Sequence, residues 1–384
     1  MNTKKQNTKS LEDIHRRLSN VISLRELTGE MNGIESIHAE TSVNSLITDS
    51  RRVTPGSAFF AIPGLRSNGE EFIDEALSRG AKVVIGENLN FVAPQGVVKV
   101  MVNDSRIALA RMARRYHGYP DNFLKIVGVT GTNGKTTVST LVRHLLEEPG
   151  NPVGLIGTVR YHLGDRELPS FRTTPEASDL YPMLRSMLVG GCSEAVMEVS
   201  SHGIHQSRVA DLSIRVAAFL NLTRDHLDYH GNMESYFREK RKIFNGENGK
   251  CPSIAVINGD CPYGQRLIQE LPPQVRVLSF GLGQENLFRA RNINLSSDGA
   301  EFLFESPVGS MMVTSPMLGR YNVMNLLASF SILYAMGRSI PDAIRKVGAF
   351  NGVDGRMEPV EKGQDFNVVV DYAPVSYTHL RAHE

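Results

Sequence analysis

The stretch KIVGVTGTNGKTTVSTLVRHLL, residues 125–146, decides the fold class of this chain. An apolar run leads into a loop that contains Gly128, Gly131 and Gly134, and apolar residues at helical spacing follow. Glycines let successive backbone N–H groups turn toward one anion, and the start of a helix adds a partial positive charge. Lys135 would reach the outer phosphates of a nucleotide, and Thr136 would offer its hydroxyl to Mg²⁺. The stretch therefore predicts a strand, a phosphate-binding loop and a helix.

The spacing departs from the strict phosphate-loop pattern, because Val129 occupies the place of the first glycine. The plainest alternative is a glycine-rich turn that binds nothing. A lysine beside three glycines would serve no packing purpose there, so ATP or GTP binding is favoured. The loop alone does not separate a kinase from a GTPase, an ATPase or a ligase.

Apolar, β-branched runs alternate with amphipathic segments around this loop. The candidate strands are 152–157, 194–199, 216–222 and 253–260, and the candidate helices are 136–148 and 179–188. Strands that are apolar throughout are typical of a parallel sheet covered by helices on both faces. We therefore expect an α/β protein with a mostly parallel central sheet.

The chain has 384 residues and is 41% hydrophobic, which is enough for two or three domains with large cores. Short β-type runs and the helix, turn and strand pattern of 69–87 predict a small α/β domain over 1–120. A central domain would cover 121–352. A glycine-rich joint at 352–356 precedes an apolar run at 366–370, which predicts a buried strand and the start of a third domain over 353–373.

Composition excludes several classes of function. The 42 basic and 41 acidic residues give a net charge of +1, so no global field favours nucleic acid or an anionic membrane. The first residues are polar, and no apolar run approaches the ~18 residues of a membrane helix. The three cysteines form no paired framework. We expect a cytoplasmic protein that does not insert into a membrane and is a monomer.

Polar residues follow two of the candidate strands. Glu198 lies near the end of one strand, where a carboxylate could hold Mg²⁺, although an ordinary strand-end charge is the plainer alternative. The other strand runs into a segment that holds Asp225, His226, Asp228 and His230. Such a cluster favours a metal or phosphate site, and Mg²⁺ ranks above zinc because no cysteine is near. Lys240 lies on a predicted helix and by itself indicates only a solvated basic face.

Five segments, taken together and in this order, resemble the Mur ligase family. They are GVTGTNGKTT, RTTPE, MEVSSHGIHQSRV, NLTRDHLDYHG and YFREKRKIF. The resemblance extends from about residue 46 to 373 and is strongest to the tripeptide synthetases of the family, the MurE type. It implies a UDP-binding N-terminal domain, a central ATPase domain and a Rossmann-like C-terminal domain.

The resemblance also implies an activity. Members of this type use ATP and Mg²⁺ to add the third amino acid of the peptidoglycan stem to UDP-MurNAc-L-Ala-D-Glu, through an acyl phosphate. They carry a lysine carbamate made with CO₂. The amino acid that would be added, whether meso-diaminopimelate, L-lysine or another, is not indicated by these residues.

The resemblance assigns roles to particular positions. ATP contacts match Gly131, Thr132, Asn133, Gly134, Lys135, Thr136, Thr137, Asn322, Arg356 and Asp371. Mg²⁺ ligands match Thr136, Glu198, His226 and the carbamylated Lys240, and these with Lys135 form the expected catalytic set. Uridine-nucleotide contacts match Thr48, Ser50, Leu65, Arg66 and Ser67, and muramoyl-dipeptide contacts match Thr173, Thr174, Ser200, Gln206 and Arg208.

The resemblance ends at residue 373. Pro374 stands where the family carries histidine, and residues 374–384 match nothing in the family, so we expect a non-native tail. We accordingly expect a C-terminally truncated ligase that is inactive by itself. Two alternatives stay open: a folylpolyglutamate or cyanophycin-type ligase, and a non-catalytic nucleotide-binding fragment.

Overall fold

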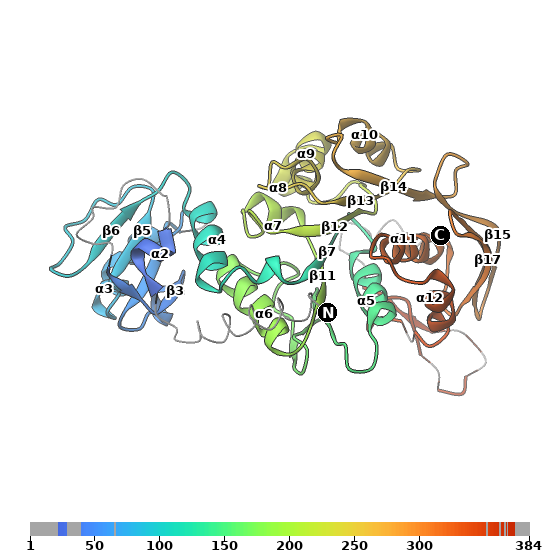
Figure 1. Cartoon of the computed structure of the whole chain (residues 1–384), viewed down its shortest axis with the longest axis horizontal. Helices are drawn as coiled ribbons and strands as arrows, with labels where there is room; N and C mark the ends of the chain where they lie inside the picture. Colours follow the sequence, from blue (N-terminus) through green and yellow to red (C-terminus); the bar gives the residue numbers. More distant parts are fainter. Residues whose placement is uncertain are drawn as a thin grey trace, which may run out of the picture. The chain divides into compact units, whose positions relative to one another are not determined.

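The fold is taken from a computed structural model that describes residues 22–28, 40–64, 67–350, 352–360, 362–364, 366 and 368–372. The chain divides into two compact units (Figure 1). The first holds the residues up to Pro120 together with 175–185 and 206–211, and the second holds the rest. Among the described residues, no helix has both the length and the apolar character needed to cross a bilayer.

The first unit is built on a parallel sheet in the order β3-β4-β5-β6. Its strands are β3 (Ser45–Ile47), β4 (Ser57–Ala61), β5 (Val83–Gly86) and β6 (Val98–Met101), and its helices are α2 (Leu24–Thr28), α3 (Ile73–Ser78) and α4 (Ser105–Tyr116). A short antiparallel pair, β1 (Ile22–Ser23) and β2 (Ser42–Val43), lies beside α2. Strand β4 is buried along its whole length. The helix, turn and strand predicted within 69–87 are confirmed as α3, a turn at Gly80 and β5.

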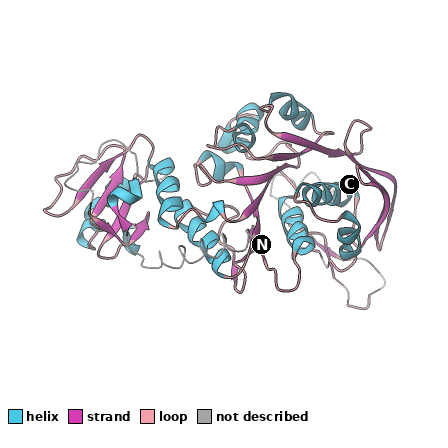
Figure 2. Cartoon of the chain, in the orientation of Figure 1, coloured by secondary structure: helices cyan, strands magenta, loops and turns pink. Residues whose placement is uncertain are grey.

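The second unit is built on one eleven-stranded sheet in the order β10-β9-β8-β11-β7-β12-β13-β14-β15-β16-β17 (Figures 1 and 2). Its strands are β7 (Lys125–Thr130), β8 (Val153–Ile156), β9 (Arg160–His162), β10 (Glu167–Pro169), β11 (Glu194–Glu198), β12 (Ile214–Phe219), β13 (Ile254–Asn258), β14 (Arg276–Gly281), β15 (Phe288–Ser296), β16 (Gly299–Ser306) and β17 (Gly309–Ser315). Seven strands that are consecutive in the sheet, β8, β11, β7, β12, β13, β14 and β15, run parallel to one another. The outer strands at both edges are antiparallel.

Helices cover both faces of this sheet, as a parallel sheet requires. They are α5 (Lys135–Leu146), α7 (Ser201–His205), α8 (Leu227–His230), α9 (Met233–Asn245), α10 (Pro262–Glu270), α11 (Arg320–Ala335) and α12 (Ile340–Val347). A further helix, α6 (Ala177–Val189), begins within residues 175–185 of the first unit and ends in the second. One face carries α5, α11 and α12, and the other carries α7, α9 and α10 (Figure 1). Helix α11 is buried on nearly all sides, because it packs against α5 and against strands β13, β14 and β15.

The fold class is confirmed as α/β with a mostly parallel central sheet, and each of the four candidate strands and both candidate helices around the loop is present. The buried strand predicted over 366–370 is wrong. Among the described residues of this run, only Val369 and Val370 form a strand, β19 (Val369–Val370), which pairs with β18 (Glu358–Pro359). Phe366 is 65% and Val370 48% exposed. A two-residue antiparallel pair provides no face that could bury this run. The expected non-native tail lies outside the described residues.

Candidate active site

Strand order brings the candidate residues to one edge of the central sheet. Strand β7 lies between β11 and β12, and all three run parallel, so their carboxyl ends meet. This is a topological switch point, where open α/β sheets bind ligands. The phosphate loop follows β7, Glu198 ends β11, and Asn221 follows β12.

The phosphate loop is braced by Asn221. Its Oδ1 accepts from the backbone N–H groups of Thr132 at 3.1 Å and Asn133 at 2.9 Å, and its Nδ2 donates to the Asn133 carbonyl at 3.1 Å. Gly134 caps α5 at φ +86°, and a Cβ there would lie 2.5 Å from the Asn325 Oδ1. Glycine is therefore required at position 134 for two reasons: the positive φ angle, and the lack of space for a Cβ beside Asn325. The result is a rigid turn that presents the N-terminus of α5.

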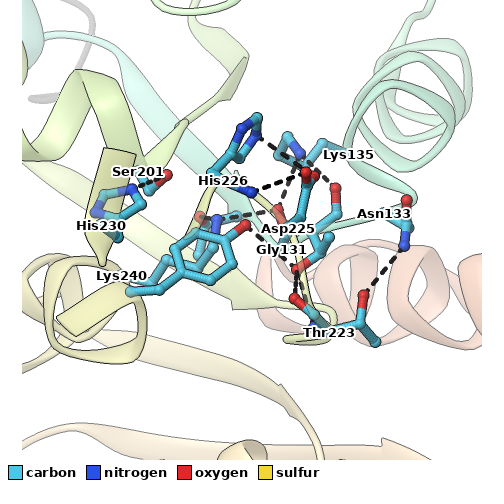
Figure 3. Close-up of polar contacts among 12 residues, drawn as sticks. Gly131, Asn133, Lys135, Ser201, Thr223, Asp225, His226, His230 and Lys240 are labelled. Atoms are coloured by element: carbon cyan, nitrogen blue, oxygen red, sulfur yellow. Dashed lines mark hydrogen bonds and ion pairs between the residues drawn. The ribbon is translucent and has the colours of Figure 1, made fainter. Parts of the chain in front are cut away.

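Two lysines meet at this loop (Figure 3). Lys135 Nζ donates to the carbonyl oxygens of Gly131 at 2.9 Å and Thr132 at 2.8 Å. Lys240 Nζ donates to the same Gly131 oxygen at 3.0 Å and lies 4.8 Å from the ring centroid of Tyr236. Lys240 is only 1% exposed, so the solvated basic face is excluded. Burial lowers the pKa of Lys135, and it lowers the pKa of Lys240 further, with the charge of Lys135 as the second cause.

Glu198 is fully buried and is held by three hydrogen bonds. Its carboxylate accepts from Thr136 Oγ1 at 3.0 Å, from the Thr158 N–H at 2.7 Å and from Thr158 Oγ1 at 3.0 Å. Burial raises the pKa of Glu198, and the nearby charge of Lys135 opposes that shift. A hydroxyl beside a carboxylate, both close to the phosphate loop, is an oxygen donor set that fits Mg²⁺.

The side chains of Asp225, His226, Asp228 and His230 do not form one cluster. His226 adopts a left-handed conformation at φ +53°, with its N–H donating to Asp225 Oδ1 at 2.9 Å and its Nε2 3.5 Å from Asp225 Oδ2. His230 instead contacts Ser201 Oγ at 3.0 Å, and burial lowers its pKa to about 4. Asp228 is exposed. No group of three histidine, cysteine, aspartate or glutamate residues is arranged to hold a metal in the part of the chain that the structure describes. The predicted four-residue metal or phosphate cluster is thus reduced to the pair Asp225 and His226.

A cavity of about 240 Å³ opens beside the phosphate loop. Its lining includes the loop residues Asn133, Gly134 and Thr137 together with Asn322, Arg356 and Asp371, which the family resemblance had assigned to ATP. Arg356 stacks on Tyr372, with its guanidinium carbon 4.6 Å from the ring centroid.

A second cavity of about 130 Å³ is lined by Thr136, Thr140, Thr158, Arg160, His162 and Glu198. The two cavities therefore border different faces of the first turns of α5.

Several candidate substrate residues are engaged within the protein. Thr174 is buried, and its Oγ1 contacts the Glu198 carbonyl oxygen at 2.9 Å and Ser200 Oγ at 3.0 Å. Thr173 Oγ1 lies 3.0 Å from Thr158 Oγ1.

The remaining candidates lie in the first unit. Arg208 Nε is 3.0 Å from Glu176 Oε1, and its NH2 group donates to Gln206 Oε1 at 2.5 Å. Ser50 Oγ donates to Glu75 Oε2 at 2.6 Å. Thr48 and Ser67 are not buried, while Leu65 and Arg66 lie outside the described residues.

Sequence reasoning missed four residues that shape the site: Thr158, Asn221, Tyr236 and Asn325. Thr158 and Asn221 each follow the carboxyl end of a parallel strand, and the rule that found Glu198 could have found them. Tyr236 and Asn325 lie on helices far along the chain, and no local pattern marks them.

Family models match the chain over much of this architecture. Residues 129–333 match the Mur ligase middle domain, and residues 42–117 match the Mur ligase family catalytic domain. This chain belongs to the Mur ligase family.

Curated Mur ligases support that assignment. The chain is 42% identical over 337 residues to the UDP-N-acetylmuramoyl-L-alanyl-D-glutamate–2,6-diaminopimelate ligase of Solibacter usitatus. The alignment covers 87% of this chain and 67% of that relative. It is 40% identical to the ligase of the same name from Geobacter metallireducens, with coverage of 86% and 65%. The chain thus spans about two thirds of the length of the curated relatives it matches. A solved structure of a ligase of this name superposes with a TM-score of 0.78 at 29% identity, covering 92% of this chain and 71% of that one.

Proposed function

We propose that this Mur ligase takes part in ATP-dependent amide bond formation, in which 2,6-diaminopimelate is joined to UDP-MurNAc-L-Ala-D-Glu. The choice of amino acid follows the names of the curated relatives. The observation that carries the proposal is the phosphate loop flanked by the buried Glu198 and the buried Lys240. A general nucleotide-binding loop has no need for a second buried lysine.

ATP is proposed to occupy the cavity lined by Asn322, Arg356 and Asp371, with its phosphates toward the N-terminus of α5. Lys135 would exchange its carbonyl partners for phosphate oxygens, which are better acceptors for an ammonium group. Thr136, Glu198, His226 and Lys240 are proposed to hold Mg²⁺. When bound, the metal supplies positive charge that offsets the charge of the phosphates.

Lys240 is proposed to react with CO₂ to form a carbamate. The neutral amine attacks the carbon of CO₂ and a proton leaves, which turns a cation into an anion. Burial favours this step, because it keeps the pKa of Lys240 well below its ordinary value and so favours the neutral amine.

The UDP sugar and its dipeptide are proposed to contact two sets of residues. The uridine nucleotide would contact Thr48, Ser50, Leu65, Arg66 and Ser67, and the muramoyl dipeptide Thr173, Thr174, Ser200, Gln206 and Arg208. The carboxylate to be activated is the γ-carboxylate of D-glutamate. Its oxygen attacks the γ-phosphorus of ATP, ADP leaves, and an acyl phosphate forms. The amine then attacks the acyl carbon and inorganic phosphate leaves.

The chain's own groups lower the barrier to the first transfer. Two anions must approach each other, and Lys135 and the N-terminus of α5 stabilise the charge that spreads over the phosphoryl oxygens. The brace from Asn221 keeps the loop in place and limits reorganisation.

Binding measurements test this proposal on the chain itself. Calorimetry should show binding of UDP-MurNAc-L-Ala-D-Glu and, separately, Mg²⁺-dependent binding of a non-hydrolysable ATP analogue. Lys135→Ala should abolish detectable nucleotide binding and leave UDP-sugar binding intact, whereas the exposed-site control Lys82→Ala should bind both ligands normally. Nucleotide binding by Lys135→Ala at the unmodified affinity would overturn the assigned role, and failure of the unmodified chain to bind the UDP sugar would overturn the substrate.

A further inference from the structure

Two residues of the three-residue connection between β8 and β9, Gly157 and Thr158, lie against the carboxylate of Glu198. A Cβ at position 157 would lie 2.7 Å from Glu198 Oε1, so only glycine allows the backbone to come this close. The next residue then reaches both carboxylate oxygens, with its N–H on Oε1 at 2.7 Å and its hydroxyl on Oε2 at 3.0 Å.

The hydroxyl of Thr158 makes one more contact, with Thr173 Oγ1 at 3.0 Å. A hydroxyl carries a single hydrogen, and that of Thr158 points at Glu198. In this contact Thr158 must therefore be the acceptor and Thr173 the donor. The three groups form a directed chain from Thr173 through Thr158 to Glu198.

We propose that Thr158 is a positioning residue that orients the Glu198 carboxylate for a divalent cation and links that carboxylate to Thr173. The inference rests on the proposed function, in which Glu198 holds Mg²⁺ and Thr173 contacts the dipeptide. A ligand that engages the Thr173 hydroxyl changes what Thr158 accepts, and so changes how firmly Thr158 holds Glu198. Occupancy of the dipeptide site is thereby coupled to binding of the metal-nucleotide complex.

Two features separate this role from ordinary packing. The Thr158 side chain is only partly buried and lines the smaller cavity, so it is not a core residue that fills space. Its bonds also converge on a carboxylate that has no other described side-chain donor except Thr136. Groups that hydrogen-bond a ligating carboxylate are a known determinant of metal affinity.

The test is calorimetric binding of a non-hydrolysable ATP analogue at graded Mg²⁺ concentrations. Thr158→Val keeps the shape and the backbone N–H and removes only the hydroxyl. It should raise the Mg²⁺ concentration for half-maximal binding about tenfold, the usual cost of losing a partner of a metal ligand. Thr158→Ser restores the hydroxyl and should return close to the unmodified value. Thr314→Val, at an exposed position of β17, is the matched control and should have no effect.

A second arm measures the link to the dipeptide site. Adding UDP-MurNAc-L-Ala-D-Glu should change the affinity of the unmodified chain for the Mg²⁺-nucleotide complex by about fivefold or more, the lower end of common couplings between sites. Thr158→Val should lose this coupling. Thr173→Val leaves all three bonds to Glu198 in place. It should therefore keep the Mg²⁺ dependence and lose the coupling, measured at a UDP-MurNAc-L-Ala-D-Glu concentration that saturates this variant. This variant keeps the inference testable even if Thr158→Val does not fold.

The outcomes distinguish a failure of the proposed function from a failure of the role assigned to Thr158. If the unmodified chain shows no Mg²⁺-dependent nucleotide binding, the proposed function falls and the role of Thr158 falls with it. If it does bind, but Thr158→Val has the same Mg²⁺ dependence and coupling, only the role of Thr158 is overturned. Equal weakening in Thr158→Val and Thr158→Ser would also overturn it, because the effect would then not depend on the hydroxyl.

Discussion

Lys135 and Lys240 donate to the same acceptor, the carbonyl oxygen of Gly131, at 2.9 and 3.0 Å. Burial lowers the pKa of both ammonium groups, and the charge of Lys135 further lowers the pKa of Lys240. A lowered pKa favours the neutral amine of Lys240. The unmodified lysine thus tethers the phosphate loop, and conversion to an anion would release that contact.

The first prediction concerns the chemistry of Lys240. Incubation with ¹³C-labelled bicarbonate should give a carbamate resonance in the ¹³C NMR spectrum that is absent in Lys240→Met. The matched control is Lys242→Met on the same helix, since Lys242 is partly exposed and paired with Glu239 at 2.8 Å. The α-amino group also reacts with CO₂ and provides an internal reference in all three samples. A spectrum unchanged by Lys240→Met would rule out the carbamate at this position.

The second prediction separates two costs at Gly134. Gly134→Ala meets an unfavourable backbone angle and a contact 2.5 Å from Asn325 Oδ1. Gly150→Ala meets a similar angle, φ +75°, with nothing within 4 Å. Both variants should lose about 1 kcal/mol of unfolding free energy in urea titrations from the backbone angle. Only Gly134→Ala should also lose nucleotide binding, and retention of binding would show that the loop tolerates a side chain there.

The third prediction distinguishes two neighbouring threonines. Thr174→Val leaves the partly buried Ser200 N–H, which donates to Thr174 Oγ1 at 3.0 Å, without its acceptor. It should destabilise the protein by about 1–3 kcal/mol, with or without ligands. Thr173→Val removes one partly exposed hydrogen bond and should cost about 1 kcal/mol or less. Equal losses of unfolding free energy in the two variants would contradict this assignment.

The fourth prediction is a pH dependence of stability that comes from His117 in the first unit. Burial, with a smaller effect of Arg185, lowers the pKa of His117 from 6.5 to about 4 in the folded state. Between these values the unfolded chain binds more protons, so this residue makes the protein more stable as pH rises from about 4 to 6.5. Over this pH range, His117 should raise the free energy of unfolding by about 3 kcal/mol. His117→Gln should remove that component, and urea titrations across this pH range that show parallel curves for both proteins would refute it.

Local sequence signals were sufficient for the phosphate loop and for five strands of the central sheet, β7, β8, β11, β12 and β13. The strands beside β7 carry mostly apolar, buried side chains because both of their faces are covered, and the loop needs glycine for its backbone angle at position 134. These requirements act on single residues or short runs, which a sequence displays directly.

Features that depend on residues far apart in the chain could not be predicted from the sequence. Lys240 has charged neighbours on both sides in the sequence, and only the packing of α9 against the loop buries it. Asp225, His226, Asp228 and His230 are close in sequence, but the left-handed turn at His226 and the short helix α8 direct them to different partners. The described residues of the apolar run at 366–370 are not buried, because β18, the strand that pairs with β19, is only two residues long.

The position of β7 between β11 and β12 also affects how the protein folds. Asn221 is 89 positions beyond Thr132, and Glu198 is 62 positions beyond Thr136. Parallel neighbours pair only after a long crossover has closed, which is a slow kind of step. The phosphate loop is therefore complete only in molecules whose three central strands are already in register. In a refolding experiment, nucleotide binding should thus lag behind the recovery of helical circular dichroism.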